Sequence, residues 1–162
     1  MTQVQHGIVP LPTTYQSVRY QPARIRIIRP KILCVEDEPL LQQLYRAVLK
    51  DAGEVVIASD GRTAVEIFQQ FPDDYGLILT DYMMPQMNGL EFLRAIQGYV
   101  RPPRLLLSAD PDRALQEQAV ALGALAVLQK PVENQVLRSI ARELLNGPQS
   151  QTLEEYLHSR MF

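Results

Sequence analysis

Five side chains with complementary chemistry stand at separated points of the sequence: the acids Glu36, Asp37 and Asp81, the hydroxyl of Ser108 and the amine of Lys130. Three carboxylates crowded together repel one another, and a divalent cation is the usual remedy. Mg²⁺ (or Mn²⁺) suits such a site, because it prefers oxygen ligands and often binds carboxylates together with phosphate oxygens. A phosphoryl group on an Asp carboxylate would be neutralised by the cation and an ammonium group, while a hydroxyl donates a hydrogen bond.

None of these residues is informative alone. An acid at the end of a strand often caps a turn, and a pair of acids such as Glu36 and Asp37 often caps a helix. The set becomes a site only if the fold brings its members together. Their function therefore depends on the elements that carry them.

Short apolar runs alternate with longer stretches of helical periodicity. Residues 77–80 suit a buried strand and run directly into Asp81, and Pro85 and Asn88-Gly89 follow as turn signals. Strands are predicted at 31–35, 55–58, 77–80, 105–107 and 125–128. Apolar residues at helical spacing follow each strand and predict helices that end near Gly53, Pro72, Gln97, Leu122 and Leu145.

Five strand and helix pairs in strict alternation predict an α/β fold, a doubly wound five-stranded parallel sheet with helices on both faces. Right-handed crossovers bring the carboxyl ends of all strands to one edge, where ligands bind in such sheets. The positions just beyond the strands hold Glu36, Asp37, Asp81, Ser108 and Lys130. The spacing therefore predicts one site at this edge.

These segments resemble the receiver domains of bacterial two-component response regulators, including the single-domain regulators of chemotaxis type. The resemblance covers 30–146 and rests on segments in the family's order: Glu36-Asp37-Glu38-Pro39, Asp60-Gly61, the run from Asp81 to Gly89, Ser108-Ala109 and Lys130-Pro131. It implies the flavodoxin-like receiver fold with five helices. It also implies a cis peptide bond between Lys130 and Pro131, although few X-Pro bonds are cis.

The resemblance implies a role for each site residue. Asp81 is expected to be the phosphoacceptor, with Lys130 contacting the phosphoryl group and Ser108 acting as the switch hydroxyl. The expected ligands of Mg²⁺ (or Mn²⁺) are three carboxylates and one backbone carbonyl: Glu36, Asp37, Asp81 and Met83. By the same resemblance, Met83 and Asp110 flank the path of the water that attacks the acyl phosphate, and we expect both to modulate dephosphorylation.

The sequence departs from the family's pattern at Val127, where an aromatic residue usually stands three positions before the lysine. A valine cannot swing a ring between a pocket and solvent. Signalling is therefore expected to rest on backbone and loop shifts around Ser108 or on other side chains. The alternative is that Val127 only fills a strand position.

The implied function is that of a stand-alone response regulator in a two-component or phosphorelay system, not an enzyme. It would accept a phosphoryl group from a histidine kinase or phosphotransfer protein and signal to a downstream protein effector, with homodimer formation as one form of output. Two alternatives remain. One is a haloacid-dehalogenase-like phosphatase, which needs a second acid where this chain has Met83, and the other is a pseudo-receiver that serves only as an interaction module.

Length and composition bound the rest of the chain. With 162 residues, 46% hydrophobic and 21% charged, one globular domain at 30–146 is expected. The extension 1–29 is basic and contains prolines, which predicts a flexible or loosely docked arm, with nucleic acid or a membrane surface as an alternative contact. The tail 147–162 is predicted to form an amphipathic helix capped by Thr152 with Glu155, docked on its own domain or on a second subunit. Its predicted apolar face consists of Leu153, Tyr156, Leu157 and Met161.

Several classes of protein are disfavoured. The sequence has no run of 18 apolar residues and no apolar signal core, so no membrane span is expected. Neither extension is long enough for a winged helix, so no dedicated nucleic-acid-binding domain is expected. The one cysteine, Cys34, lies in an apolar run and fits a reducing compartment, which predicts a cytoplasmic protein with a small core residue at this position.

Overall fold

The computed structural model describes residues 29–146 and 151–160. Its sheet has five parallel strands: β1 (Lys31–Val35), β2 (Glu54–Ala58), β3 (Tyr75–Asp81), β4 (Arg104–Ser108) and β5 (Ala126–Gln129). They lie in the order β2-β1-β3-β4-β5, so β3 is central and β5 lies at an edge. The predicted doubly wound parallel sheet is confirmed.

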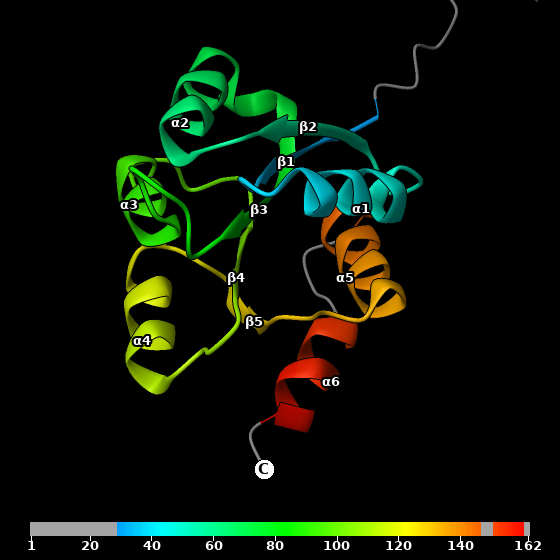
Figure 1. The fold of residues 1–162 in the computed structure, drawn as a ribbon. Helices are drawn as coiled ribbons and strands as arrows, with labels where there is room; N and C mark the ends of the chain where they lie inside the picture. Colours follow the sequence, from blue (N-terminus) through cyan, green and yellow to red (C-terminus); the bar gives the residue numbers. More distant parts are fainter. Residues whose placement is uncertain (1–28, 147–150, 161–162) are drawn as a thin grey trace, which may run out of the picture.

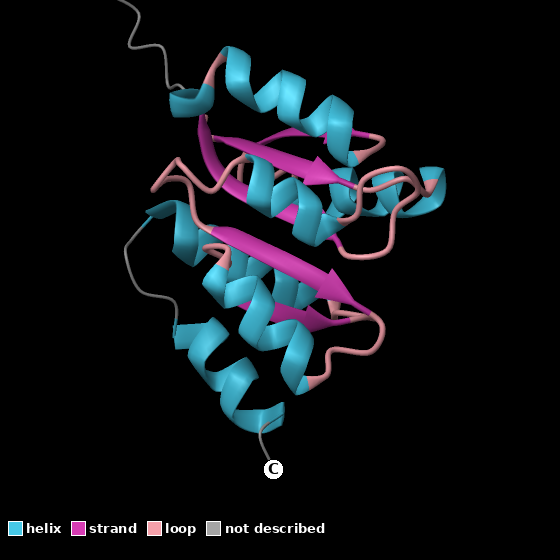
Figure 2. Cartoon of the chain, turned by 90° about the vertical axis from the view of Figure 1, so that its left-hand side faces the viewer, coloured by secondary structure: helices cyan, strands magenta, loops and turns pink. Residues whose placement is uncertain are grey.

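The part of the chain that the structure describes forms six α-helices: α1 (Pro39–Leu49), α2 (Gly61–Gln70), α3 (Gly89–Ala95), α4 (Arg113–Ala121), α5 (Asn134–Asn146) and α6 (Gln151–Arg160). A short 3₁₀ turn at Pro72–Asp74, which the sequence did not predict, precedes β3. Figure 1 shows α2, α3 and α4 on one face of the sheet, α1 and α5 on the other, and α6 beyond α5. Figure 2 shows the strands between these helical layers.

The core is divided by the pleat of the strands, because successive side chains point to opposite faces. Ile32 and Cys34 of β1 are buried on the face of α1 and α5, whereas Leu33 and Val35 are buried on the face of α2 and α3. Burial raises the pKa of the Cys34 thiol to about 12, so this thiol stays protonated near neutral pH. Cys34 is therefore the small core residue that the apolar run predicts.

Side-chain caps fix where several helices begin. Asp60 accepts a hydrogen bond from the Thr63 N–H at the start of α2, and Asn88 forms a capping box with Glu91 at the start of α3. The sequence predicted that the fourth helix opens with Ser108 to Pro111. It begins instead at Arg113, because the Asp112 carboxylate accepts the N–H of Leu115 and ends the loop there.

The C-terminal tail forms a helix that packs on its own domain. The buried Leu153 belongs to the hydrophobic cluster between the sheet and α5, and Tyr156 and Leu157 pack against the same cluster. The prediction of Thr152 as the N-cap is wrong, because α6 already begins at Gln151 and Thr152 lies within its first turn. Met161, predicted to share the apolar face, lies outside the described residues.

Other predictions fall at the ends of the described region. The basic arm lies outside the described residues except for Arg29, whose guanidinium donates to the Lys50 carbonyl at 3.2 Å. The predicted cis bond between Lys130 and Pro131 is present, and a second one, unpredicted, joins Arg101 to Pro102. Within 29–146 and 151–160, no helix has the length and apolar character that crossing a membrane requires.

Candidate functional site

The predicted site lies at the carboxyl edge of the sheet, and the strands deliver its residues there. Asp81 is the last residue of β3, and the next residue, Tyr82, bonds through its N–H to the Leu107 carbonyl of β4. Glu36 directly follows β1 and donates its N–H to the Ala58 carbonyl of β2. Parallel pairing therefore continues one residue beyond the strands and holds both acids in place.

The three predicted acids come together. Carboxylate oxygens of Glu36, Asp37 and Asp81 lie within 4.8 Å of one another. Glu36 is 1% exposed and Asp81 6% exposed, whereas Asp37 lies on the surface. The Glu36 carboxylate also accepts the N–H of Glu38 at 3.1 Å, so the turn after β1 orients it.

Lys130 joins this cluster from the end of β5, the outermost strand on the β4 side of the sheet. Its ammonium lies 2.9 Å from Oδ1 of Asp81 and 3.4 Å from Oε2 of Glu36. Burial lowers the pKa of Lys130, but the hydrogen bond and charge of Asp81, together with Glu36, outweigh burial, and the net shift is upward. The lysine is therefore held as a cation beside the acids.

Burial has the opposite consequence for Glu36. It raises the pKa of this carboxyl, and the Glu38 N–H and the Lys130 ammonium only partly offset the shift. With all side chains ionised, three carboxylates and one ammonium leave a formal charge of −2. The residues therefore fit a divalent cation with oxygen ligands, such as Mg²⁺ or Mn²⁺, which would balance this charge.

Ser108 stands beside the lysine at the end of β4. Its side chain is buried, its Oγ accepts the N–H of Asp110 at 3.2 Å, and its carbonyl accepts the N–H of Lys130 at 2.7 Å. Of the two predicted modulators, Asp110 lies exposed in the loop after β4, and the Met83 side chain is 70% exposed after β3. Val127 lies on β5, buried in the cluster between the sheet and α4.

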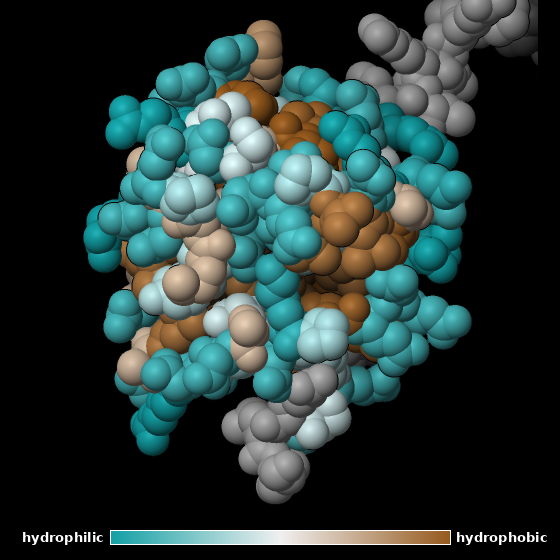
Figure 3. Space-filling model, viewed as in Figure 1, coloured by the Kyte–Doolittle hydropathy of each residue, from teal (hydrophilic) through white to brown (hydrophobic). Residues whose placement is uncertain are grey.

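Two features of the site were not predicted from the sequence. An apolar groove of about 310 Å³ lies beside Lys130 between α1 and α5, where Leu41, Leu44 and Val132 line it. Figure 3 shows apolar surface gathered over α1 and α5. The other feature is the contact of Tyr156 with Gln129, the residue before Lys130. The amphipathic pattern predicts that Tyr156 docks, but its hydroxyl bonds to the backbone of Gln129. A pattern of side chains does not reveal a contact with backbone.

The described arrangement suits phosphoryl chemistry. The carboxylate of Asp81 can act as a nucleophile toward phosphorus, and Lys130 lies where it would neutralise the oxygens of the transferred group. A cation held by the acids would neutralise the opposite side of that group. Catalysis at such a site consists mainly of positioning and charge stabilisation.

Comparison with known proteins points the same way. Residues 32–142 match the family profile described as "Response regulator receiver domain". The chain is 35% identical over 134 residues to the alkaline phosphatase synthesis transcriptional regulatory protein SphR of Synechococcus elongatus, a match covering 76% of this chain and 52% of SphR. It is 33% identical over 106 residues to the probable chemotaxis protein CheY of Rhizobium etli, a match covering 62% of this chain and 81% of that protein.

Solved structures share the fold. The match to the chemotaxis protein CheY4 of Vibrio cholerae has a TM-score of 0.62 at 29% identity and covers 81% of this chain and 98% of that one. A response regulator receiver domain protein from Clostridium thermocellum gives a TM-score of 0.65 at 29% identity and covers 72% and 94% of the two chains. The matched region spans only about half the length of SphR and smaller fractions of the histidine kinases that also match.

Proposed function

The chain belongs to the response regulator receiver domain family, and we propose that it accepts a phosphoryl group on Asp81 from a phosphohistidine of a histidine kinase or phosphotransfer protein. An oxygen of the Asp81 carboxylate attacks phosphorus, the P–N bond to the histidine breaks, and the imidazole leaves. The aspartyl phosphate retains the charge of the transferred group. The electron pair of the P–N bond stays on the ring nitrogen, which takes up a proton from solvent, so the histidine is released as neutral imidazole.

The observation that carries this proposal is the contact of Lys130 with Asp81 inside an acidic cluster. Lys130 orients one oxygen of Asp81 and stabilises the charge that gathers on the phosphoryl group in the transition state. Glu36, Asp37 and Asp81, with the backbone carbonyl of Met83, would hold the Mg²⁺, which supplies charge neutralisation for the phosphoryl oxygens when bound.

The signal leaves the domain as a change of surface. Ser108 acts as the switch hydroxyl, and because its carbonyl accepts the Lys130 N–H, a shift of one residue is transmitted to the other. A downstream protein effector reads the change by preferring one of the two arrangements. With Val127 in place of an aromatic residue, the shift is carried by backbone around Ser108 and by side chains other than that of residue 127.

Labelling with radioactive acetyl phosphate tests the phosphoacceptor. In the presence of Mg²⁺ the wild-type protein should take up label, and Asp81→Asn should take up none. Asp73→Asn is the matched control, because Asp73 is an exposed acid in the 3₁₀ turn before β3, whereas Asp81 lies at the other end of that strand. Label uptake by Asp81→Asn at the wild-type rate would refute the assignment.

The same experiment reads the lifetime of the aspartyl phosphate. We propose that Met83 and Asp110 modulate dephosphorylation, Met83 as an apolar group near the approach of water and Asp110 as a group that can orient it. After removal of the donor, Met83→Ala and Asp110→Ala should lose label at rates that differ from wild type. Equal half-lives in all three proteins would remove both residues from this role.

A further inference from the structure

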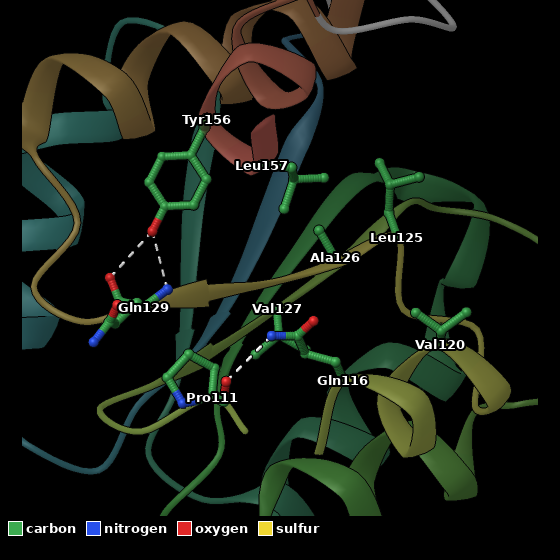
Figure 4. Close-up of a pocket in the computed structure, with 9 residues that line it drawn as sticks. All are labelled: Pro111, Gln116, Val120, Leu125, Ala126, Val127, Gln129, Tyr156 and Leu157. Atoms are coloured by element: carbon green, nitrogen blue, oxygen red, sulfur yellow. Dashed lines mark hydrogen bonds between the residues drawn. The ribbon is translucent and has the colours of Figure 1, made fainter. Parts of the chain in front are cut away.

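The edge strand β5 is completed by a side chain from α6. Among residues 29–146 and 151–160, β5 has β4 on one side and no strand on the other. The Tyr156 hydroxyl lies on that open side, where it accepts the Gln129 N–H at 3.0 Å and donates to the Gln129 carbonyl at 3.4 Å. Figure 4 shows the phenol ring pointing from α6 to the end of β5. One hydroxyl thus satisfies both backbone groups that a sixth strand would have paired.

Apolar contacts hold α6 in the position from which the Tyr156 hydroxyl reaches β5. Leu153 is 5% exposed in the cluster with α5, and Tyr156 and Leu157 pack on the same cluster. A helix this short is not stable alone in water, so its position depends on these contacts. The Tyr156 hydroxyl is therefore brought to β5 by docking and leaves it if α6 undocks.

The peptide that Tyr156 holds leads directly into the phosphoacceptor site. Gln129 precedes Lys130, whose N–H bonds to the Ser108 carbonyl and whose ammonium bonds to Asp81. The contact of Tyr156 with Gln129, the peptide bond to Lys130 and the contact of the Lys130 ammonium with Asp81 therefore connect α6 with the acceptor carboxylate. None of them depends on the identity of a side chain at position 129.

The space beside the same strand end, between α6 and α4, is loosely filled. A cavity of about 280 Å³ lies between α4, β5 and α6, and Val127, Gln116 and Leu157 are among the residues that line it (Figure 4). The short Val127 side chain contributes to this space. The end of β5 therefore has room to move toward α4, and Tyr156 opposes such movement from the α6 side.

We propose that Tyr156 is a positioning residue for phosphorylation of Asp81, because docked α6 holds the end of β5 in the arrangement of the unphosphorylated domain. The inference rests on the proposed function. A phosphoryl group on Asp81 must fit between the carboxylate and the Lys130 ammonium, which are now 2.9 Å apart, so Lys130 is displaced outward and the Gln129 peptide shifts with it. The bonds to the phenol are then lost. Docking of α6 and phosphorylation therefore oppose each other, and the linkage is reciprocal.

The central test is Tyr156→Phe, which removes the hydroxyl and keeps the ring. Without a phosphodonor, the Gln129 amide proton should exchange faster in this variant than in wild type when measured by NMR. With acetyl phosphate and Mg²⁺, the variant should be phosphorylated about three- to tenfold faster, an effect of the size expected when the hydrogen bonds of one hydroxyl are lost. The affinity for Mg²⁺ should stay unchanged, because the acids that would hold the cation do not contact α6.

Two further variants test whether the effect comes from undocking of α6 or from a general destabilisation of the domain. Tyr99→Phe is the control, since Tyr99 packs edge-on against Phe68 on the face opposite α6, and it should match wild type in every readout. Leu153→Ala weakens docking without touching Gln129 and should accelerate phosphorylation as Tyr156→Phe does. In wild type, phosphorylation should itself speed exchange of the Gln129 amide, and Asp81→Asn should show no such response.

The outcomes distinguish the two proposals. If no variant and no wild-type sample takes up label, the proposed function fails and this inference with it. If all proteins are labelled on Asp81 but Tyr156→Phe and Leu153→Ala are labelled at the rate of Tyr99→Phe, only the role of Tyr156 is overturned. A Gln129 amide whose exchange is insensitive to phosphorylation would overturn it as well.

Discussion

The burial of the Glu36 carboxylate opposes the stability of the folded protein when this group is ionised. Its carboxylate is almost fully buried, and burial raises its pKa, so the ionised form is disfavoured in the folded protein. Ionised Glu36 has the Glu38 N–H and Lys130 as partners, and Lys130 also serves Asp81. A cation-binding site of this kind is destabilising until the cation arrives.

This conflict predicts the pH dependence of the metal-free protein. Because the folded-state pKa of Glu36 lies above the ordinary 4.5, its proton favours folding, and that contribution is complete below pH 4.5 and lost as pH rises through the folded-state pKa. Lys130, with a pKa above 10.5, adds stability that is lost only at still higher pH. Urea unfolding in EDTA should therefore show stability falling as pH rises from 4.5 toward neutrality.

The substitution Glu36→Gln imitates the protonated carboxyl. At pH 7.5 without Mg²⁺, it should raise the free energy of unfolding by about 1 kcal/mol. Added Mg²⁺ should stabilise wild type and leave the variant unchanged, which reverses the order. Glu66→Gln on the exposed side of α2 is the control and should change neither value. A variant less stable than wild type in EDTA would contradict this account.

At the residue scale, the sequence predicted which side chains meet but not how. Strand ends placed Asp81 and Lys130 at the same edge of the sheet, because the crossover rule makes such positions neighbours. The sharing of Lys130 between Asp81 and Glu36 depends on side-chain geometry across 49 and 94 positions of sequence, respectively. No local pattern encodes that geometry, so it could only be observed.

At the scale of elements, α3 is pressed against the strand that carries Asp81. The Gly89 N–H, at the first position of α3, donates to the Tyr82 carbonyl at 2.9 Å. A Cβ at Gly89 would lie 2.4 Å from the Asp81 carbonyl oxygen and 2.6 Å from the Leu106 side chain. Backbone cannot yield as a flexible side chain would, so only glycine fits this close approach.

Gly89→Ala should therefore destabilise the protein by about 2 kcal/mol, despite the better helix propensity of alanine. Gly98→Ala is the matched control, because a Cβ at Gly98 would meet nothing within 4 Å. That substitution should change stability by less than about 0.5 kcal/mol. Urea titration of the three proteins measures both effects, and equal midpoints for the two variants would refute the packing argument.

The elements show where local sequence rules succeed. Two helix starts follow from local rules alone, because Asp60 and Asn88 each accept a hydrogen bond from the N–H of the residue three positions later. The start of α4 was misplaced, since Pro111 and Asp112 both suit a first turn and only the bond to Leu115 decides between them. Thr152 with Glu155 matched a capping box in spacing alone, and the helix had already begun.

At the scale of the whole molecule, apolar surface lies next to the site. On α1, Leu40 is 71% exposed and Leu44 39% exposed, and the groove that Leu44 shares with α5 opens beside Lys130. Under the proposed function, a phosphohistidine donor must bring its imidazole to Asp81, so the surface of that donor has to cover this part of the domain. Exposed leucines there are suited to contact with a partner.

Leu40→Ser should therefore slow phosphotransfer from a phosphohistidine protein about tenfold and leave labelling by acetyl phosphate unchanged, because the small donor needs no surface. Val100→Ser is the control, since Val100 is 98% exposed in the loop before β4, at the opposite edge of the sheet. Rapid-quench measurements with both donors separate docking from chemistry. An equal loss with acetyl phosphate would show that Leu40 affects the site itself.

The sheet order gives the site unequal mechanical compliance. Glu36 and Asp37 follow β1, Asp81 ends β3 and Ser108 ends β4, and each of these strands is paired on both sides. Of the five site residues, Lys130 alone follows an edge strand. The backbone that carries Lys130 is therefore less constrained than the backbone that carries the other four. Strain introduced by a new covalent group relaxes where stiffness is lowest. Strand order alone therefore indicates that the end of β5, with Lys130, moves first when a group is added to the site, whatever the switch side chains are.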